Sequence, residues 1–130
     1  MSVNILIISH NEIGSALLNA VKQTFNSELP LPVATVELEP NADPEVLIPK
    51  LKKVVCALNQ GDGVLILTDL FGSTPSNIAN NIKDCEGTRI VTGLNLPMLI
   101  RVMNYPDLDL PQLAEKACSG GQCGIMVCET

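Results

Sequence analysis

Short apolar runs along the chain alternate with longer stretches in which apolar residues recur every three or four positions. Val3–Ile8 is the clearest run, aliphatic at all but one position, as is typical of a strand buried on both faces. Similar runs predict strands at 33–38, 64–68 and 88–92, and Gly124–Cys128 predicts a short last strand.

The stretches between these runs have helical periodicity. A second helix is predicted to begin at Asp43-Pro44, and Pro49 is expected to kink its first turn or delay its start. Three more helices are predicted, one after Pro75, one around 99–103 and one around 112–118. The last of these should end at Ser119-Gly120-Gly121. The buried stripe predicted for the first helix consists of Ile13, Ala16, Leu17, Ala20, Val21 and Thr24 or Phe25.

Strands that alternate with helices of this length favour a mostly parallel sheet, because a parallel pair needs a long crossover between its strands. Right-handed crossovers place helices on both faces and bring the loops after the strands to one edge. We therefore predict a single three-layer α/β domain over residues 1–130, with a short last strand.

Two of the predicted strands end in residues that can carry chemistry. His10, the only histidine in the chain, ends the first strand, and Asp69 directly follows the strand at 64–68. Because parallel strands carry their ligands at their carboxyl ends, His10 and Asp69 are expected to face each other at one edge. The turn at 93–97 should lie on the same edge.

After Asp69 the chain turns at Gly72 and enters a helix. Thr74 or Ser73 is the expected N-cap, with Pro75 at the first helical position, where its missing N–H costs nothing. The N–H groups at a helix start can hold an anion, so this segment is a candidate anion site.

Each of these features also has an ordinary structural explanation. A single histidine is often merely exposed, Asp69 could be a turn or capping residue, and Thr74-Pro75 could be an N-cap without a ligand. A doubly wound module that binds a small anion without covalent chemistry is therefore one possibility that the residues leave open.

Composition narrows the choice of partners. The net charge of −6 argues against nucleic acid, which calls for clustered Lys and Arg. No apolar stretch approaches the length of a membrane span, and the N-terminus has no basic region, so a cytoplasmic protein is expected. The five cysteines lack the spacing of a disulfide scaffold or a C-x-x-C metal pair and are expected to be buried reduced thiols.

Three ordered motifs resemble those of one known family. The stretch Asp69–Asn77, DLFGSTPSN, resembles the D-L-[FW]-G-G-S-P-x-N motif of the mannose-family IIA domains of the bacterial phosphoenolpyruvate-dependent sugar phosphotransferase system (PTS). Ser9-His10 is similar to the T-H-G phosphorylation site of that family, and residues 93–98, GLNLPM, are similar to its G-x-N-L-P-M motif. Asn11 stands in place of the motif glycine, and Ser73-Thr74 stand in place of Gly-Ser.

The resemblance implies that the chain is a phosphohistidine carrier with no cofactor and no metal. His10 would accept a phosphoryl group from phospho-HPr on Nε2 and pass it to a separate IIB component, while Asp69 orients the ring through Nδ1. Thr74 would contact the phosphoryl group, and Asn95 would border the site. The remaining phosphate-binding residues would be Gly72, Ser73, Pro75, Ser76 and Asn77.

The resemblance also implies a homodimer, in which Gly124–Cys128 could pair across chains, and membrane contact only through permease partners. It leaves the role of the carrier open between two functions. One is sugar uptake, and the other is regulation by the same chemistry, including that of a dihydroxyacetone-kinase-type subunit.

Overall fold

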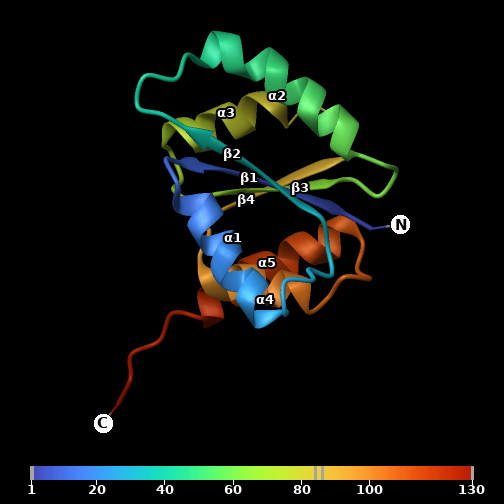
Figure 1. Ribbon diagram of the computed structural model, residues 1–130, viewed down its shortest axis with the longest axis vertical. Coiled ribbons are helices and arrows are strands. Elements are labelled where there is room, and N and C mark those ends of the chain that lie inside the picture. The colour runs from blue at the N-terminus through green and yellow to red at the C-terminus, as the bar shows by residue number, and fades with distance from the viewer. Residues whose placement is uncertain (1, 84, 86, 130) are drawn as a thin grey trace.

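The computed structural model describes residues 2–83, 85 and 87–129, and within them the strands and helices alternate as far as α4 (Figure 1). The strands are β1 (Asn4–His10), β2 (Val33–Leu38), β3 (Val64–Thr68) and β4 (Thr88–Thr92). The helices are α1 (Ile13–Thr24), α2 (Pro44–Leu58), α3 (Thr74–Ile82), α4 (Leu96–Met103) and α5 (Leu110–Cys123). No helix in the described part of the chain is long and apolar enough to cross a membrane.

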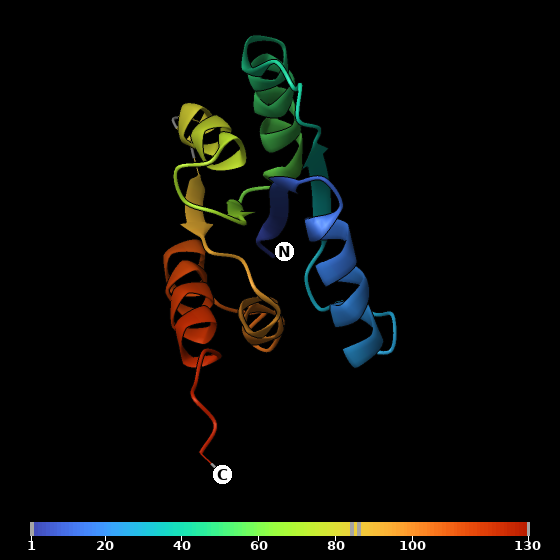
Figure 2. The same ribbon diagram turned by 90° about the vertical axis from the view of Figure 1, so that its left-hand side faces the viewer.

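The four strands form a parallel sheet in the order β2-β1-β3-β4. Helices α2 and α3 cover one face, and α1, α4 and α5 cover the other, so the domain has the predicted three layers (Figures 1 and 2). In the register Ile8 pairs with Val36 of β2 and with Thr68 of β3. The carboxyl ends of β1 and β3 therefore lie side by side, as the candidate site requires.

Side chains alternate between the two faces of the sheet and create two apolar cores. Ile5 and Leu65 pack toward α1, α4 and α5, whereas Leu6 and Ile66 pack toward α2 and α3. All four are fully buried, and burial of each such side chain stabilises the fold by about 1.5–3 kcal/mol. The nearly continuous apolar runs in the sequence follow from this burial on both faces.

The buried stripe of α1 differs from the predicted one. Its buried residues are Gly14, Leu18 and Val21, while Ile13 is 44% exposed and Ala16 is also exposed. The reason is a close approach to β1: a Cβ on Gly14 would lie 2.7 Å from Ile7 Cγ2. The helix rotates its glycine inward, and this rotation turns Ile13 toward solvent.

The effects of the prolines were only partly predicted. Helix α2 begins at Pro44 and is not delayed by Pro49, because Asp43 caps it by accepting a 3.0 Å hydrogen bond from the Glu45 N–H. Because Pro49 has no N–H, the Glu45 carbonyl lacks its usual hydrogen-bond donor within the helix. Both residues are exposed, so water can satisfy that carbonyl. Helix α4 begins at Leu96, three residues earlier than predicted, because Asn95 caps it.

Helix α5 does not end at residues 119–121, where the sequence predicts a stop. Asp109 caps its start, and the helix continues to Cys123. Gly120 and Gly121 face α4 closely: a Cβ on Gly120 would lie 2.4 Å from the Cβ of Arg101. These glycines allow two helices to approach rather than marking a turn.

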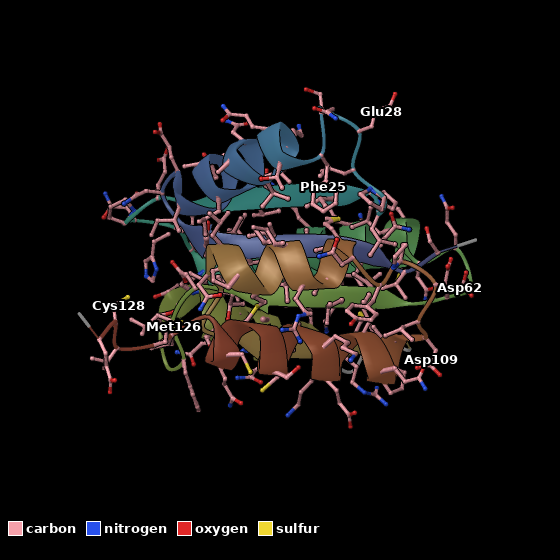
Figure 3. The ribbon with its side chains drawn as sticks, turned by 90° about the horizontal axis from the view of Figure 1, so that it is seen from below. Phe25, Glu28, Asp62, Asp109, Met126 and Cys128 are labelled. Atoms are coloured by element: carbon pink, nitrogen blue, oxygen red, sulfur yellow. The ribbon has the colours of Figure 1, made fainter. Side chains whose placement is uncertain are left out.

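The prediction of a strand at 124–128 is wrong for this chain. The segment leaves the domain without strand structure, and Ile125, Met126 and Val127 are 77%, 72% and 93% exposed. Figure 3 shows Met126 and Cys128 at the opposite end of the molecule from Asp62 and Asp109, which precede β3 and α5. The tail therefore departs from the carboxyl edge of the sheet and does not turn back along β4.

The cysteines also depart from expectation. Cys56, Cys118, Cys123 and Cys128 are exposed, not buried. Cys85, the remaining cysteine, is half-buried three residues after the end of α3.

Candidate functional site

His10 and Asp69 meet at the carboxyl edge of the sheet, as predicted from their strand ends. One carboxylate oxygen, Oδ2 of Asp69, lies 2.8 Å from Nδ1 of the His10 ring and 3.0 Å from the backbone nitrogen of His10. The Asp69 side chain is 9% exposed, whereas the His10 side chain is 41% exposed. The carboxylate is therefore held in the protein beside the ring edge that carries Nδ1, and the ring is open to solvent.

The shared oxygen determines which ring nitrogen carries the proton. An ionised carboxylate can only accept, so a neutral imidazole that bonds to it must carry its proton on Nδ1. Nε2 then has a lone pair and lies on the opposite side of the ring. This arrangement provides an oriented nucleophile.

The charge of Asp69 is maintained by the same contacts. Burial alone raises the pKa of this carboxyl, but the backbone N–H and the ring of His10 both favour the ionised form. Together these hydrogen bonds and the ring charge lower the pKa of Asp69 below its usual value. The carboxylate is thus ionised at neutral pH.

The segment after Asp69 forms the predicted turn and helix start. Gly72 has φ +81°, and Ser73, not Thr74, occupies the N-cap position of α3. The Ser73 hydroxyl donates to the Leu70 carbonyl at 2.5 Å and makes no capping bond to the helix. The N–H groups of the first turn therefore receive no side-chain cap, and Pro75 lies within this turn.

The other residues predicted for this segment divide by exposure. Thr74 and Asn77 are not buried at the start of α3, whereas Pro75 and Ser76 are buried. Ser76 can therefore offer an anion its backbone N–H more readily than its hydroxyl.

Asn95 borders the edge but is largely occupied by structural contacts. The loop before it is fixed beside β3, since the Leu94 N–H donates to the Thr68 carbonyl at 2.9 Å. The Asn95 amide oxygen accepts from the Met98 N–H at 2.9 Å, and its NH₂ group donates to the Gly121 carbonyl at 3.1 Å. Its amide thus joins α4 to α5 at the border of the site.

Asn11 occupies the position after His10 without disturbing the edge. It has φ +44°, a left-handed conformation that asparagine tolerates better than most residues. Its N–H donates to the Leu38 carbonyl of β2 at 3.0 Å. The replacement of the motif glycine is therefore compatible with the loop.

Three features at this edge were missed by sequence reasoning. Thr68 Oγ1 and Asp69 Oδ1 are buried without a hydrogen-bond partner. Leu70 and Phe71 are 61% and 70% exposed. A surface cavity of about 390 Å³ is lined by Asn11, Glu12, Glu37 and Glu39. The sequence signal for the exposed Leu70 and Phe71 was an apolar pair between a carboxylate and a turn glycine. The signal for the cavity was the recurrence of glutamate around two strand ends.

The chain is similar to proteins of one family over most of its length. Residues 4–117 match the family model EIIA-man, described as the PTS system fructose IIA component. A relative from Escherichia coli K12, the PTS system mannose-specific EIIAB component, is 28% identical over 128 residues. The match covers 96% of this chain, but the chain spans only 39% of that relative.

Solved structures agree with this match. The mannose/sorbose-specific IIA subunit of the phosphotransferase system from Enterococcus faecalis is 26% identical, with a TM-score of 0.83 and coverage of 100% of this chain and 97% of that one. The PTS IIA protein associated with the fucose utilization operon of Streptococcus pneumoniae is 25% identical, with a TM-score of 0.80 and coverage of 98% and 96%.

Proposed function

The chain belongs to the EIIA-man family of PTS IIA components, and from this premise we propose that it carries phosphoryl groups for sugar uptake in the cytoplasm. His10 is the acceptor, phospho-HPr is the donor, and a IIB component receives the group. One observation supports this role above the others: Asp69 Oδ2 lies 2.8 Å from Nδ1 of His10, which leaves Nε2 available for attack.

The proposed transfer needs no change in protonation of the ring. The Nε2 lone pair forms a bond to phosphorus while the bond between phosphorus and the donor breaks, and the donor atom keeps that electron pair. The Nδ1 proton remains between the ring and Asp69, which offsets the positive charge that develops on the imidazole. Transfer to the IIB component is the reverse of this step.

The start of α3 is proposed to hold the oxygens of the transferred group. Gly72 and Ser76 offer backbone N–H groups at the positive end of the helix. The N–H groups of Ser73 and Asn77 already donate to the Leu70 and Ser73 carbonyls, at 3.3 Å and 2.9 Å, so these two residues would contact the group through their side chains. Pro75 has no N–H and fixes the first turn instead. Thr74 adds a hydroxyl, and Asn95 holds the neighbouring loop in place. Phosphoryl transfer of this kind depends mainly on positioning and charge stabilisation.

The direct test uses the one histidine in the chain. Wild-type protein incubated with enzyme I, HPr and labelled phosphoenolpyruvate should acquire one label that is lost in acid and stable in alkali, as a phosphoramidate is. His10→Ala should acquire none, and Asn11→Ala serves as a neighbouring control that should still be labelled. Labelling of folded His10→Ala would refute the assignment, and tight phosphate binding without any covalent label would favour a non-covalent anion-binding module.

We also propose that two copies of the chain associate through the C-terminal tail. Residues Ile125–Val127 are exposed, and the outer edge of β4 has no strand beside it among the described residues. A cavity of about 480 Å³ lies between β4 and α5. An added strand would satisfy the open edge of β4 and cover apolar side chains.

Light scattering at micromolar concentration should give twice the chain mass, and Val127→Asp should lower the measured mass toward that of the monomer. A monomeric wild type would contradict this proposal.

A further inference from the structure

Three of the five cysteines lie near the C-terminal end of the sequence, and all three are exposed free thiols. Cys118 and Cys123 belong to α5, and Cys128 belongs to the tail that follows this helix. The phosphoryl transfer proposed for His10 makes no use of them. Exposed thiols can be oxidised to a disulfide where the backbone is able to bring two of them together.

Cys118 lies on the side of α5 that faces the open edge of β4. It lines the cavity of about 480 Å³ between β4 and α5, and it also lines a cavity of about 200 Å³ that shares Thr92 with the first. We call these two cavities together the groove. Ile125 lines the smaller cavity, so the tail begins at the part of the groove that Cys118 lines. Cys123 lines neither cavity, because five residues of helix turn it about 140° away from Cys118.

The tail beyond Ile125 is not held by the rest of the domain. The N–H groups of Gly124 and Ile125 still donate to carbonyls of α5, at 3.1 Å and 3.2 Å. Among the described residues, those at 126–129 make no hydrogen bond, and the Val127 side chain is 93% exposed. A change in the direction of the tail after Ile125 therefore breaks no hydrogen bond and costs mainly the ordering of a few residues.

The tail is long enough to bring Cys128 back to Cys118. Cys128 follows Ile125 by three residues, which span at most about 10 Å. Cys118 precedes Ile125 by seven residues, which correspond to about 10 Å along a helix. The Cα atoms of a disulfide are themselves about 5.5 Å apart, so a tail that turns back over the groove brings the two thiols within bonding reach.

We propose that Cys118 and Cys128 of one chain form a disulfide that fastens the tail over the groove of its own chain. The apolar residues of the tail then cover the groove in place of the tail of a second copy. The oxidised chain is therefore a monomer, whereas the reduced chain is free to associate. This consequence rests on the association proposed above, but the disulfide itself does not, and neither depends on His10. In a reducing compartment such a bond is transient and acts as a redox sensor.

The oxidant is a small disulfide, oxidised glutathione. The Cys128 thiolate attacks one sulfur of oxidised glutathione, forms a mixed disulfide and displaces one glutathione thiolate. The Cys118 thiolate then attacks the Cys128 sulfur, and the second glutathione thiolate leaves. The two protein thiols thus lose two electrons and two protons. The electrons reduce oxidised glutathione, and the protons are taken up by the two glutathione thiolates.

Differential alkylation identifies the pair. Reduced protein is incubated with oxidised glutathione, its free thiols are blocked with iodoacetamide, and its disulfides are then reduced and labelled with N-ethylmaleimide. Trypsin leaves residues 117–130 as one peptide, because no Lys or Arg follows Lys116, so the three thiols are compared in one spectrum. We expect N-ethylmaleimide on Cys118 and Cys128 and iodoacetamide on Cys123. Before reduction, the intact protein should be lighter by two hydrogens and carry no glutathione.

Serine variants provide the matched controls. Cys123→Ser should close the disulfide as fast as wild type, whereas Cys118→Ser should stop at the mixed disulfide, with any closure slowed at least about tenfold. Light scattering measures the consequence for association. Oxidised wild type should have the mass of the monomer, and the double variant Cys118→Ser/Cys128→Ser should keep the mass of the reduced protein after the same treatment.

Each contrary result has its own meaning. N-ethylmaleimide on Cys123, a disulfide between two chains, or glutathione adducts alone would each overturn the pairing of Cys118 with Cys128. A closed disulfide that leaves the mass in light scattering unchanged would overturn the switch. If the reduced protein is already a monomer, the proposed association fails and the switch fails with it, while the mapped peptide still decides the disulfide. Labelling of His10 tests the proposed transfer separately.

Discussion

Replacement of Asp69 by asparagine separates the charge of this side chain from its role in orienting His10. Oδ2 of Asp69 accepts from two groups at once, the ring Nδ1 at 2.8 Å and the backbone N–H of His10 at 3.0 Å. The backbone N–H is only ever a donor, so in the variant it will hold the oxygen of the new amide, not the NH₂ group, at this position. The Nδ1–H tautomer should therefore survive in Asp69→Asn.

The cost of the substitution is then mainly electrostatic. In the transition state of the proposed transfer the imidazole develops a positive charge. A unit charge about 4 Å from a carboxylate gains about 4 kcal/mol at an effective dielectric constant of about 20. Roughly half a charge would gain about 2 kcal/mol, which corresponds to about 30-fold in rate. Because the ring is 41% exposed, solvent reduces this gain. We expect Asp69→Asn to be labelled about tenfold to 30-fold more slowly than wild type.

Rapid-quench labelling with phospho-HPr measures this rate, and nitrogen NMR of the ring identifies its tautomer. Asp69→Ala is the matched comparison, because it also removes the acceptor of both donors and frees the ring to rotate. It should be at least tenfold slower than Asp69→Asn. A ring that carries its proton on Nε2 in Asp69→Asn, or equal rates for the asparagine and alanine variants, would refute this account of the shared oxygen.

Three further predictions concern stability and the helix start. Gly120→Ala should destabilise the fold by about 1–2 kcal/mol in urea titrations, because the new Cβ would lie 2.4 Å from Arg101 Cβ. This loss is expected despite the better helix propensity of alanine. The control Gly121→Ala should be close to neutral, because the nearest atom there is the flexible Met98 Cε at 3.0 Å. The pKa of Asp69 is lowered, so its ionised form contributes stability above about pH 4 that is lost as pH falls through the lowered pKa. The decrease in urea midpoint from pH 5 to pH 3 should therefore be smaller in Asp69→Asn than in wild type. Thr74→Ala should reduce labelling less than tenfold, because backbone N–H groups at the start of α3 remain.

The positions of the strands and of the site could be predicted because both depend on local pattern. The runs at 33–38, 64–68 and 88–92 are the observed β2, β3 and β4, since strands buried on both faces cannot carry many polar residues. β1 is observed at Asn4–His10, two residues beyond its predicted end. The parallel topology then brought His10 to Asp69 without any further information from the sequence.

What could not be predicted depended on contacts between distant segments. Gly120 reads as a helix breaker in isolation, and only its contact with Arg101 shows why α5 continues through it. Gly14 likewise gave no indication that it would turn inward and expose Ile13. The tail at 124–128 has the composition of a strand, but strand structure needs a neighbour, and none of the described residues pairs with it.

The backbone around His10 is held from three directions, which has a consequence for the proposed transfer. The His10 N–H is bonded to Asp69 of the β3 end, the Asn11 N–H to the Leu38 carbonyl of β2, and the Gly14 N–H to the buried Ser9 hydroxyl at 2.9 Å. The three bonds fix the residues on both sides of the ring, so the proposed nucleophile is ordered during folding and not at each encounter with a proposed partner. The inward rotation of α1 at Gly14, which exposes Ile13, is part of the same arrangement. The contact that helps to hold His10 in place therefore also turns the apolar side chain of Ile13 toward solvent.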